Sequence, residues 1–528
     1  MSRVRGLAAL LAAALLLGCA ATPTAEELVA PDPGPPVVEH DEDAVPPTPR
    51  AGAGSTGDDA TGDPDGPADE ADDAPTAVVD PGPPPPPATR PALQAAAEVL
   101  LADLLDQRQG EQVAVYVVDE HGRELVAHDA DVPVLPASTM KTVTAAAALV
   151  TFGPAHRFTT RVETTAPIGP DGVLRGDLVL VGTGDPVLAT PEYERWIYPA
   201  RPRTPVEALA DQVVAAGLTR LEGDVVGVAE GFDGPERAAG WPESYFWSFD
   251  ARWADGLALD AGLHTIVSHP DPDDGDDRPD DGDAEVDAPD DATDAPPPGP
   301  PDVRIDHTPE PALHATRELI RLLEERDVEV VGAGRIDPPP APTVGRLARV
   351  ESPPLEEILR FAVRRSDNPI SDNLFRTVGR ARTGVGSFAA GERAHLQVLE
   401  QLGLDTTGLA FADGSGLSRD DQLTARLLVD LDRTMRATRY AATWHDIMAS
   451  MGETGTLRSR LVGTVAAGRF VGKTGSLNDV QSLSGTVTGP SGRAYHLAVI
   501  ANADGQARWL SRVFVDELIV LLVRDLDG

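Results

Sequence analysis

The sequence predicts an α+β fold, and two patterns support this prediction. Residues 91–107 and 506–525 have the apolar spacing of helices, at the two ends of the part expected to fold. Three strand-like runs follow one another near the C-terminus: residues 469–477, 481–488 and 494–501. Helices around an antiparallel sheet of consecutive strands are typical of the α+β class.

The first 19 residues are typical of an export signal. Arg3 and Arg5 give a basic start, and residues 7–17 form an apolar run that is too short to span a bilayer comfortably. Leu-Leu-Gly then precedes Cys19, which resembles a bacterial lipobox, whose cysteine is lipidated and becomes the mature N-terminus. Cleavage near Ala21 is the alternative and would release a soluble exported protein. Cys19 is the only cysteine, so the sequence predicts no disulfide and no thiol nucleophile.

Two acidic segments rich in Pro, Asp and Gly are predicted to be disordered. Residues 20–90 carry a net charge of −14 and residues 268–302 carry −13, out of −41 for the chain. Neither segment can bury enough apolar surface to offset its chain entropy. The negative charge argues against nucleic acid as a partner, since phosphate would be repelled. The Asp clusters lack the spacing of a calcium loop, so the sequence predicts no metal site.

Further elements divide the folded part into a core and an insertion. Residues 112–119 are expected to form a strand and residues 138–151 an Ala-rich buried helix. Together with the C-terminal elements, these give one domain made of residues 91–154 and 346–528. The middle, residues 155–345, is predicted to be an inserted, mainly β domain that contains the disordered acidic segment.

Only two of the 44 basic residues are lysines: Lys141 and Lys473. Arginine does not lose its proton in a protein, whereas lysine can when it is desolvated or lies near another cation. A chain that otherwise uses arginine could keep lysine where proton transfer is needed. Chance is the alternative explanation for two remaining lysines.

The first lysine ends the motif Ser138-Thr139-Met140-Lys141 at the start of a predicted helix. Positions three apart share a helix face, so the side chains of Ser138 and Lys141 should meet. Free N–H groups in the first turn favour negative charge developing there. A neutral Lys141 could take the Ser138 proton as the hydroxyl attacks a carbonyl. Alone the motif is weak, because such a spacing is expected by chance in a chain of this length.

The second lysine begins Lys473-Thr474-Gly475-Ser476 on a predicted strand. Lys473 and Thr474 could bind a substrate carboxylate, and Gly475 leaves room for a substrate backbone to approach. An ordinary strand interrupted by glycine is the alternative for this motif alone.

A third motif, Ser366-Asp367-Asn368, lies between them in the sequence. Pro369 suits the first turn of a helix, so the triplet should lie on the loop before it. A second Ser-Asp-Asn at residues 371–373 falls inside the helix pattern and is interpreted as structural. Ser-x-x-Lys, Ser-Asp-Asn and Lys-Thr-Gly in this order are the set found in β-lactamases and penicillin-binding proteins.

Ser138 and Ser366 are 228 positions apart, and with this spacing the chain resembles the low-molecular-mass class C penicillin-binding proteins, the D-alanyl-D-alanine carboxypeptidase/endopeptidase family. That family inserts domains after the Ser-x-x-Lys helix. The resemblance extends to these segments: Gly182-Thr183-Gly184-Asp185-Pro186, residues 221–227, Ser352-Pro353-Pro354-Leu355, residues 413–418 (DGSGLS) and Gly455-Thr456-Leu457. It implies a β-lactamase-like transpeptidase core, with an antiparallel sheet flanked by helices. The acidic segment departs from the pattern, because it lies where the family usually folds an inserted domain.

The resemblance also implies roles. Ser138 would be the acylated nucleophile and Lys141 its general base, while Ser366 and Asn368 would relay the proton and bind the substrate amide. D-Alanine or a cross-linked amine would leave, and water would hydrolyse the acyl-enzyme. No metal or cofactor is implied, and β-lactams would trap the same serine.

The third motif would bind the rest of the substrate. Lys473 and Thr474 would hold the terminal carboxylate, on the strand that Gly475 leaves accessible. The backbone N–H groups of Ser138 and Ser476 would form the oxyanion hole.

The expected function is therefore a D-Ala-D-Ala carboxypeptidase or endopeptidase that acts outside the cytoplasm on peptidoglycan peptides, anchored to the membrane by a lipid at Cys19. One alternative is a β-lactamase or esterase on the same core, for which the sequence shows no deacylating glutamate motif. Another is a catalytically silent wall-binding lipoprotein, which has no chemical reason to keep both lysines. The sequence does not decide between the terminal D-alanine and the cross-link as the main target.

Overall fold

The structure is a computed structural model that describes residues 91–106, 111–247, 250–268, 302–336, 342–489, 492–503 and 506–527. The expected signal with Cys19, the acidic segment 20–90, and all of segment 268–302 except its two end residues lie outside these ranges. None of the helices in the described ranges is long and apolar enough to cross a membrane.

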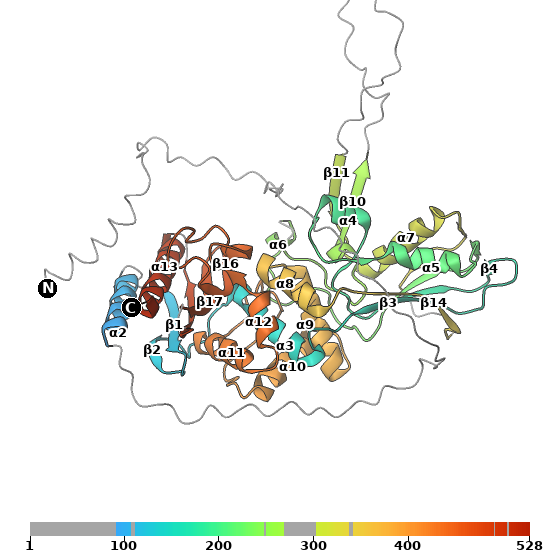
Figure 1. Cartoon of the computed structure of the whole chain (residues 1–528). Helices are drawn as coiled ribbons and strands as arrows, with labels where there is room; N and C mark the ends of the chain where they lie inside the picture. Colours follow the sequence, from blue (N-terminus) through green and yellow to red (C-terminus); the bar gives the residue numbers. More distant parts are fainter. Residues whose placement is uncertain are drawn as a thin grey trace, which may run out of the picture. The chain divides into compact units, whose positions relative to one another are not determined.

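The first layer is a six-stranded antiparallel sheet (Figure 1). Its strands, in spatial order, are β15 (Ala449–Ser450), β16 (Phe470–Leu477), β17 (Val480–Thr488), β18 (Ala494–Asn502), β1 (Gln112–Asp119) and β2 (Glu124–His128). The three C-terminal strands are consecutive neighbours, as the sequence predicts. Strand β1 pairs with β18, with Gln112 opposite Asn502, and so joins the N-terminal part to the C-terminal part.

Helices cover both faces of this sheet because β1 is apolar on both. Val113, Val115 and Val117 belong to a core cluster that includes residues of α2 (Pro91–Asp106) and α13 (Gln506–Asp527), which pack against each other. Ala114, Tyr116 and Val118 belong to the cluster on the opposite face. The alternation follows from the two-residue period of a strand.

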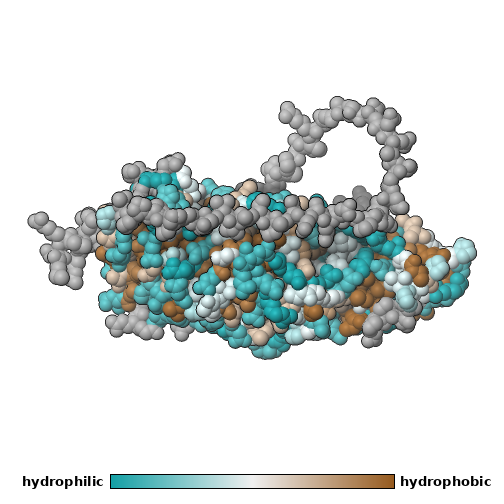
Figure 2. All heavy atoms as spheres, turned by 90° about the horizontal axis from the view of Figure 1, so that it is seen from below, coloured by the Kyte–Doolittle hydropathy of each residue, from teal (hydrophilic) through white to brown (hydrophobic). Residues whose placement is uncertain are grey.

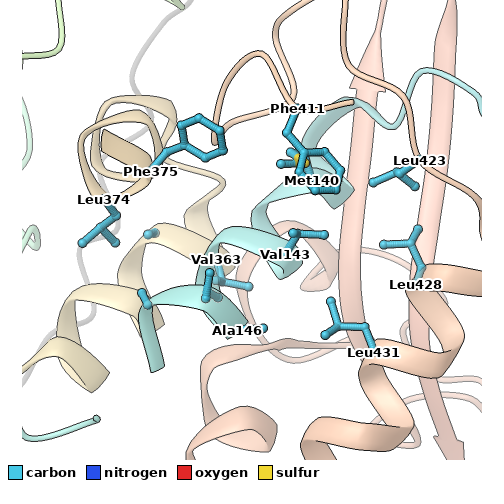
Figure 3. Close-up of a cluster of buried hydrophobic side chains, with 14 of the residues drawn as sticks. Met140, Val143, Ala146, Val363, Leu374, Phe375, Phe411, Leu423, Leu428 and Leu431 are labelled. Carbon is cyan, nitrogen blue, oxygen red and sulfur yellow. The ribbon is translucent and has the colours of Figure 1, made fainter. Parts of the chain in front are cut away.

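Helix α3 (Met140–Phe152) lies at the centre of the second cluster, after the 3₁₀ turn η1 (Ala137–Thr139). It ends at Gly153, whose φ of 77° is unfavourable for other residues. Figure 3 shows Met140, Val143 and Ala146 of α3 among apolar side chains of neighbouring elements. The labelled neighbours belong to α8 (Leu355–Arg365), α9 (Asn368–Thr383), α11 (Ala425–Ala437) and the loops at Phe411 and Leu423. The same cluster includes residues of α10 (Phe388–Gln401) and α12 (Ala441–Ile447).

Residues 155–351, called the inserted part below, contain a second sheet in the order β13-β9-β5-β3-β14. The strands are β3 (Thr159–Thr164), β5 (Leu178–Gly182), β9 (Val225–Ala229), β13 (Gly334–Arg335) and β14 (Gly345–Glu351). Helices α5 (Glu207–Ala215) and α7 (Pro311–Glu324) share one apolar cluster with this sheet. The boundary drawn at residue 346 falls within β14, which pairs with β3, so the sheet of the inserted part extends to Glu351.

Shorter elements complete the inserted part: β4 (Val173–Leu174), β6 (Leu188–Ala189), α4 (Pro191–Trp196), β7 (Thr204–Pro205), β8 (Arg220–Leu221), α6 (Ser244–Trp247), η2 (Asp260–Gly262) and β12 (Glu329–Val330). Strands β10 (Leu263–Ser268) and β11 (Asp302–His307) pair as an antiparallel ribbon, with Ser268 opposite Asp302. The two ends of the acidic segment are therefore held side by side. On the face shown in Figure 2, hydrophilic side chains predominate and apolar ones occur in small separate groups.

Candidate active site

Ser138 and Lys141 lie where η1 passes into α3, and their side chains meet. Lys141 Nζ donates to Ser138 Oγ at 3.1 Å. Ser138 is half-buried, whereas Lys141 is 1% exposed. The preceding Ala137 has a φ of 49°, a strained backbone for a residue with a side chain, and this turn presents Ser138 at the start of the helix.

Lys141 Nζ has two further acceptors besides Ser138. They are Asn368 Oδ1 at 2.7 Å and the backbone carbonyl of Ser415, also at 2.7 Å. Burial lowers the pKa of Lys141 to about 8, and four nearby carboxyl groups oppose this effect. A large share of Lys141 is therefore neutral at mildly alkaline pH, and the neutral amine can accept a proton.

The Ser366-Asp367-Asn368 motif lies where α8 ends and α9 begins. Ser366 caps α8 in the left-handed conformation, with a φ of 62°. Asp367 caps α9, since its carboxylate accepts the N–H of Ile370 at 2.9 Å. Asn368 donates from Nδ2 to the carbonyl of Asp250 at 3.0 Å, which fixes its Oδ1 toward Lys141. The two helix caps thus set the directions of the Ser366 and Asn368 side chains.

Lys473 connects the strand motif to the loop motif. Its Nζ donates to Ser366 Oγ at 3.0 Å and to the Thr474 carbonyl at 2.6 Å. Lys473 is fully buried, and burial together with the charge of Lys141 holds its pKa well below the usual range. Hydrogen bonds therefore join Lys141 to Ser138 and Asn368, and Lys473 to Ser366. The Ser366-Asp367-Asn368 motif belongs to both sets and brings together residues up to 335 positions apart in the sequence.

Strand β16 runs directly beside the Ser138 turn. Ser482 of the neighbouring strand β17 donates to the carbonyl of Pro136 at 2.7 Å. A methyl group at Gly475 would lie 2.8 Å from the backbone nitrogen of Ser138 and closer still to Ser482 Oγ. Thr474 is partly exposed and donates to the hydroxyl of Thr456 at 2.8 Å, and Ser476 is exposed. Only a residue without a side chain fits at position 475.

The sequence matches the model of the D-Ala-D-Ala carboxypeptidase 3 (S13) family over residues 93–285 and 303–516. The chain belongs to this family. A D-alanyl-D-alanine carboxypeptidase of an Actinomadura species is 32% identical over 428 residues, which cover 73% of this chain and 76% of the relative. A carboxypeptidase of Mycobacterium tuberculosis is 32% identical over 398 residues, which cover 73% and 74%.

Solved structures share the fold of this carboxypeptidase-family chain. The crystal structure of penicillin binding protein 4 from Haemophilus influenzae superposes with a TM-score of 0.64 at 20% identity, over 81% of this chain and 99% of that chain. The predicted α+β fold with a penicillin-binding-protein core is confirmed. The unmatched residues 286–302 lie within the acidic segment.

Two features of the site in this carboxypeptidase-family chain were not predicted. The Ser415 carbonyl contacts Lys141, and Thr456 contacts Thr474, although both residues lie in segments noted only for their resemblance. A backbone carbonyl leaves no side-chain pattern in a sequence. The Asp-Gly-Ser-Gly run at 413–416 was the available signal, because such residues form tight turns.

The second Ser-Asp-Asn motif, at residues 371–373, lies within α9 and is buried. Asp372 accepts the N–H of Gly414 at 3.1 Å, and Asn373 donates to the carbonyl of Asp255 at 2.8 Å. These contacts fix two loops rather than reach Ser138, in keeping with the structural interpretation.

Proposed function

We propose that this protein is a serine-type D-Ala-D-Ala carboxypeptidase that acts on peptidoglycan stem peptides, also at cross-links, and that β-lactams acylate it. The observation that carries the proposal is the contact of 3.1 Å between Ser138 Oγ and the amine of Lys141, whose pKa burial lowers to about 8. A serine beside a lysine that can be neutral is an activated nucleophile. The activities in the names of the relatives support the choice of substrate.

In the proposed reaction, Lys141 accepts the proton of Ser138 as its oxygen attacks the carbonyl of the D-Ala-D-Ala bond. Asn368 and the Ser415 carbonyl hold the amine in position, since each lies 2.7 Å from Nζ. As the C–N bond breaks, Ser366 relays the proton held by Lys141 to the leaving amine of D-alanine or of a cross-linked peptide, which leaves Lys141 neutral again for the next step. Water hydrolyses the acyl-enzyme and restores Ser138.

Lys473 and Thr474 are proposed to bind the terminal carboxylate of the substrate. Without that carboxylate, burial and Lys141 lower the pKa of Lys473. An anion beside the amine favours its charged form, so substrate binding would bring a proton onto Lys473. The exposed hydroxyl of Thr456 lies next to Thr474 and offers a further donor.

The backbone N–H groups of Ser138 and Ser476 are proposed to form the oxyanion hole. The close approach of β16 to the Ser138 turn supports this, because Gly475 brings the two backbones together.

Replacing Gly475 by alanine should lower the rate of acylation at least about tenfold, because the methyl group pushes β16 away from Ser138 and misplaces an oxyanion donor. Stopped-flow acylation by a fluorescent β-lactam measures the rate. Gly345→Ala is the matched control, since Gly345 also lies in a strand and a methyl group there meets nothing within 4 Å. Equal rates for both variants would contradict the assignment.

Acylation should depend on pH with an acidic limb near pH 8. The folded-state pKa of Lys141 is lowered to about 8, so the neutral base is the minor form below that pH and the major form above it. The rate should therefore rise about tenfold per pH unit below the limb and level off above it. A rate that is flat between about pH 6 and 10 would exclude Lys141 as the base.

A direct test measures D-alanine released from a peptide ending in D-Ala-D-Ala, together with consumption of a β-lactam. Release of D-alanine with a long-lived β-lactam adduct supports the proposal. Rapid β-lactam consumption without release would favour the β-lactamase alternative, and neither activity in folded protein would favour a silent wall-binding protein. A parallel assay with a cross-linked muropeptide dimer distinguishes endopeptidase activity from carboxypeptidase activity.

The site of action is proposed to be outside the cytoplasm, because peptidoglycan lies there and residues 1–19 are typical of an export signal. Lipidation at Cys19 would anchor the protein to the membrane. Incorporation of a labelled fatty acid tests this anchor: label in the wild type and none in Cys19→Ala is expected, and label in neither would mean cleavage near Ala21.

A further inference from the structure

A short piece of the inserted part docks on the loop that contacts Lys141. Ser418 Oγ donates to the carbonyl of Ala239 at 2.6 Å, and the N–H of Arg419 donates to the carbonyl of Gly240 at 3.2 Å. The next residue, Trp241, donates from its indole nitrogen to Asp413 Oδ2 at 2.6 Å. Three consecutive residues of the inserted part thus bond to one loop of the core.

Asp413 is the centre of that loop. It is fully buried, and its carboxylate accepts the N–H groups of Ser415 at 3.0 Å, Gly416 at 2.6 Å and Ser418 at 2.8 Å. Together with Trp241, four N–H donors surround its two oxygens. Buried charge is costly unless each oxygen keeps its partners.

The turn wrapped around Asp413 determines where the Ser415 carbonyl points. That carbonyl accepts from Lys141 Nζ at 2.7 Å, so it is one of only three acceptors for this amine among the contacts of the described residues. Gly416, with a φ of 83°, allows the loop to approach Ala137 next to the serine turn. A shift of the turn would move the carbonyl away from the amine.

We infer that Trp241 of the inserted part is a positioning residue for Lys141, acting through Asp413 and the Ser415 carbonyl; this rests on the proposed role of Lys141 as the base. The inserted part therefore supports the proposed catalytic site of the core through a side chain that bonds to Asp413 and not to Ser138. Loss of the indole donor loosens the turn and removes an acceptor that favours the charged form of Lys141.

The charged groups that face Lys141 come from several elements. They are Asp367, which caps α9, Asp372 within α9, Asp413 and Asp421 of the loop, and Lys473 of β16. Burial, together with the neighbouring Asp413, raises the pKa of Asp372 and of Asp421 well above the usual range. These neighbouring groups stay the same when only the contact between Lys141 and the Ser415 carbonyl is changed.

The chain contains a matched control for this contact. Trp444 of α12 donates from its indole nitrogen to Asp432 Oδ1 at 2.8 Å, and both residues are buried. That aspartate lies in α11 and bonds to Thr486 and His496 instead of to the loop at Ser415. Trp241→Phe and Trp444→Phe thus each remove one buried Trp–Asp bond, and only the first is linked to Lys141.

The experiment compares full-length wild type, Trp241→Phe and Trp444→Phe by thermal unfolding and by the pH dependence of acylation by benzylpenicillin. Both variants should lose similar stability. Trp241→Phe alone should acylate about tenfold more slowly on the alkaline plateau and have its acidic limb at a pH lower by about half a unit, since an acceptor for the charged amine is lost. Trp444→Phe should keep the wild-type profile.

Other outcomes are decisive as well. An unchanged profile in Trp241→Phe, or the same change in Trp444→Phe, overturns the inference. If Trp241→Phe does not fold, Ser418→Ala, which removes the bond to Ala239, should shift the limb in the same direction by a smaller amount, and an unshifted limb then overturns it. A wild type that is not acylated at all points to failure of the proposed function instead.

Discussion

Replacing Ser138 by alanine should reduce D-alanine release by at least about 10⁴-fold and leave the protein folded. In the proposed mechanism the hydroxyl removed is the group on which the acyl-enzyme forms, so the proposed base and oxyanion donors would have no nucleophile to act on. Folding should be unaffected because Ser138 is half-buried and Lys141 keeps Asn368 and the Ser415 carbonyl as acceptors. Product release is measured by a D-alanine assay, and folding by thermal unfolding.

Ser371→Ala is the matched control for this variant. Ser371 belongs to the second Ser-Asp-Asn motif, is buried, and donates to the carbonyl of Asp367 at 2.8 Å, away from Ser138. Its loss should change activity by less than about fivefold, at a small cost in stability. If Ser138→Ala kept more than about 1% of the activity, Ser138 would not be the nucleophile.

Replacing Lys141 by arginine should lower acylation at least about 10³-fold, although it preserves a cation at the same position. The guanidinium does not lose its proton in a protein, so it cannot accept the proton of Ser138. Burial has brought the pKa of Lys141 down to about 8, whereas an arginine would stay charged throughout the working range. The acylation rate should also lose its acidic limb near pH 8.

The measurement for Lys141→Arg is the acylation rate by benzylpenicillin between about pH 6 and 10, with thermal unfolding as a check on the fold. The larger side chain enters a fully buried site, so a loss of stability is expected as well. Restored activity at high pH, or more than about 10% of the wild-type rate at any pH, would show that another group takes the proton.

The sequence predicts much of the core because its elements have strong local patterns. The strand at 112–119 and the three C-terminal strands occur nearly as expected, since alternating or continuous apolar runs specify strands directly. Helix α3 follows from its run of alanines, and the start of α9 from Pro369. The three motifs are also short local patterns, so they indicated the chemically distinctive side chains directly from the sequence.

The remaining features depend on contacts between distant parts of the chain. Trp241 and Asp413 are 172 residues apart, and neither residue alone indicates the other. The Ser415 carbonyl lies 2.7 Å from Lys141 Nζ, in a loop whose N–H groups donate to the carboxylate of Asp413. Strand β14 joins the sheet of the inserted part through its pairing with β3, which the local sequence of residues 345–351 does not reveal.

The central claim is that Ser138 is the residue that is acylated, and mass spectrometry tests it most directly. Full-length protein is incubated with benzylpenicillin, its intact mass is recorded over time, and the modified peptide is sequenced. The account predicts one long-lived adduct located on Ser138, absent in Ser138→Ala. An adduct on another residue, or folded protein that neither carries an adduct nor consumes the drug, would contradict it.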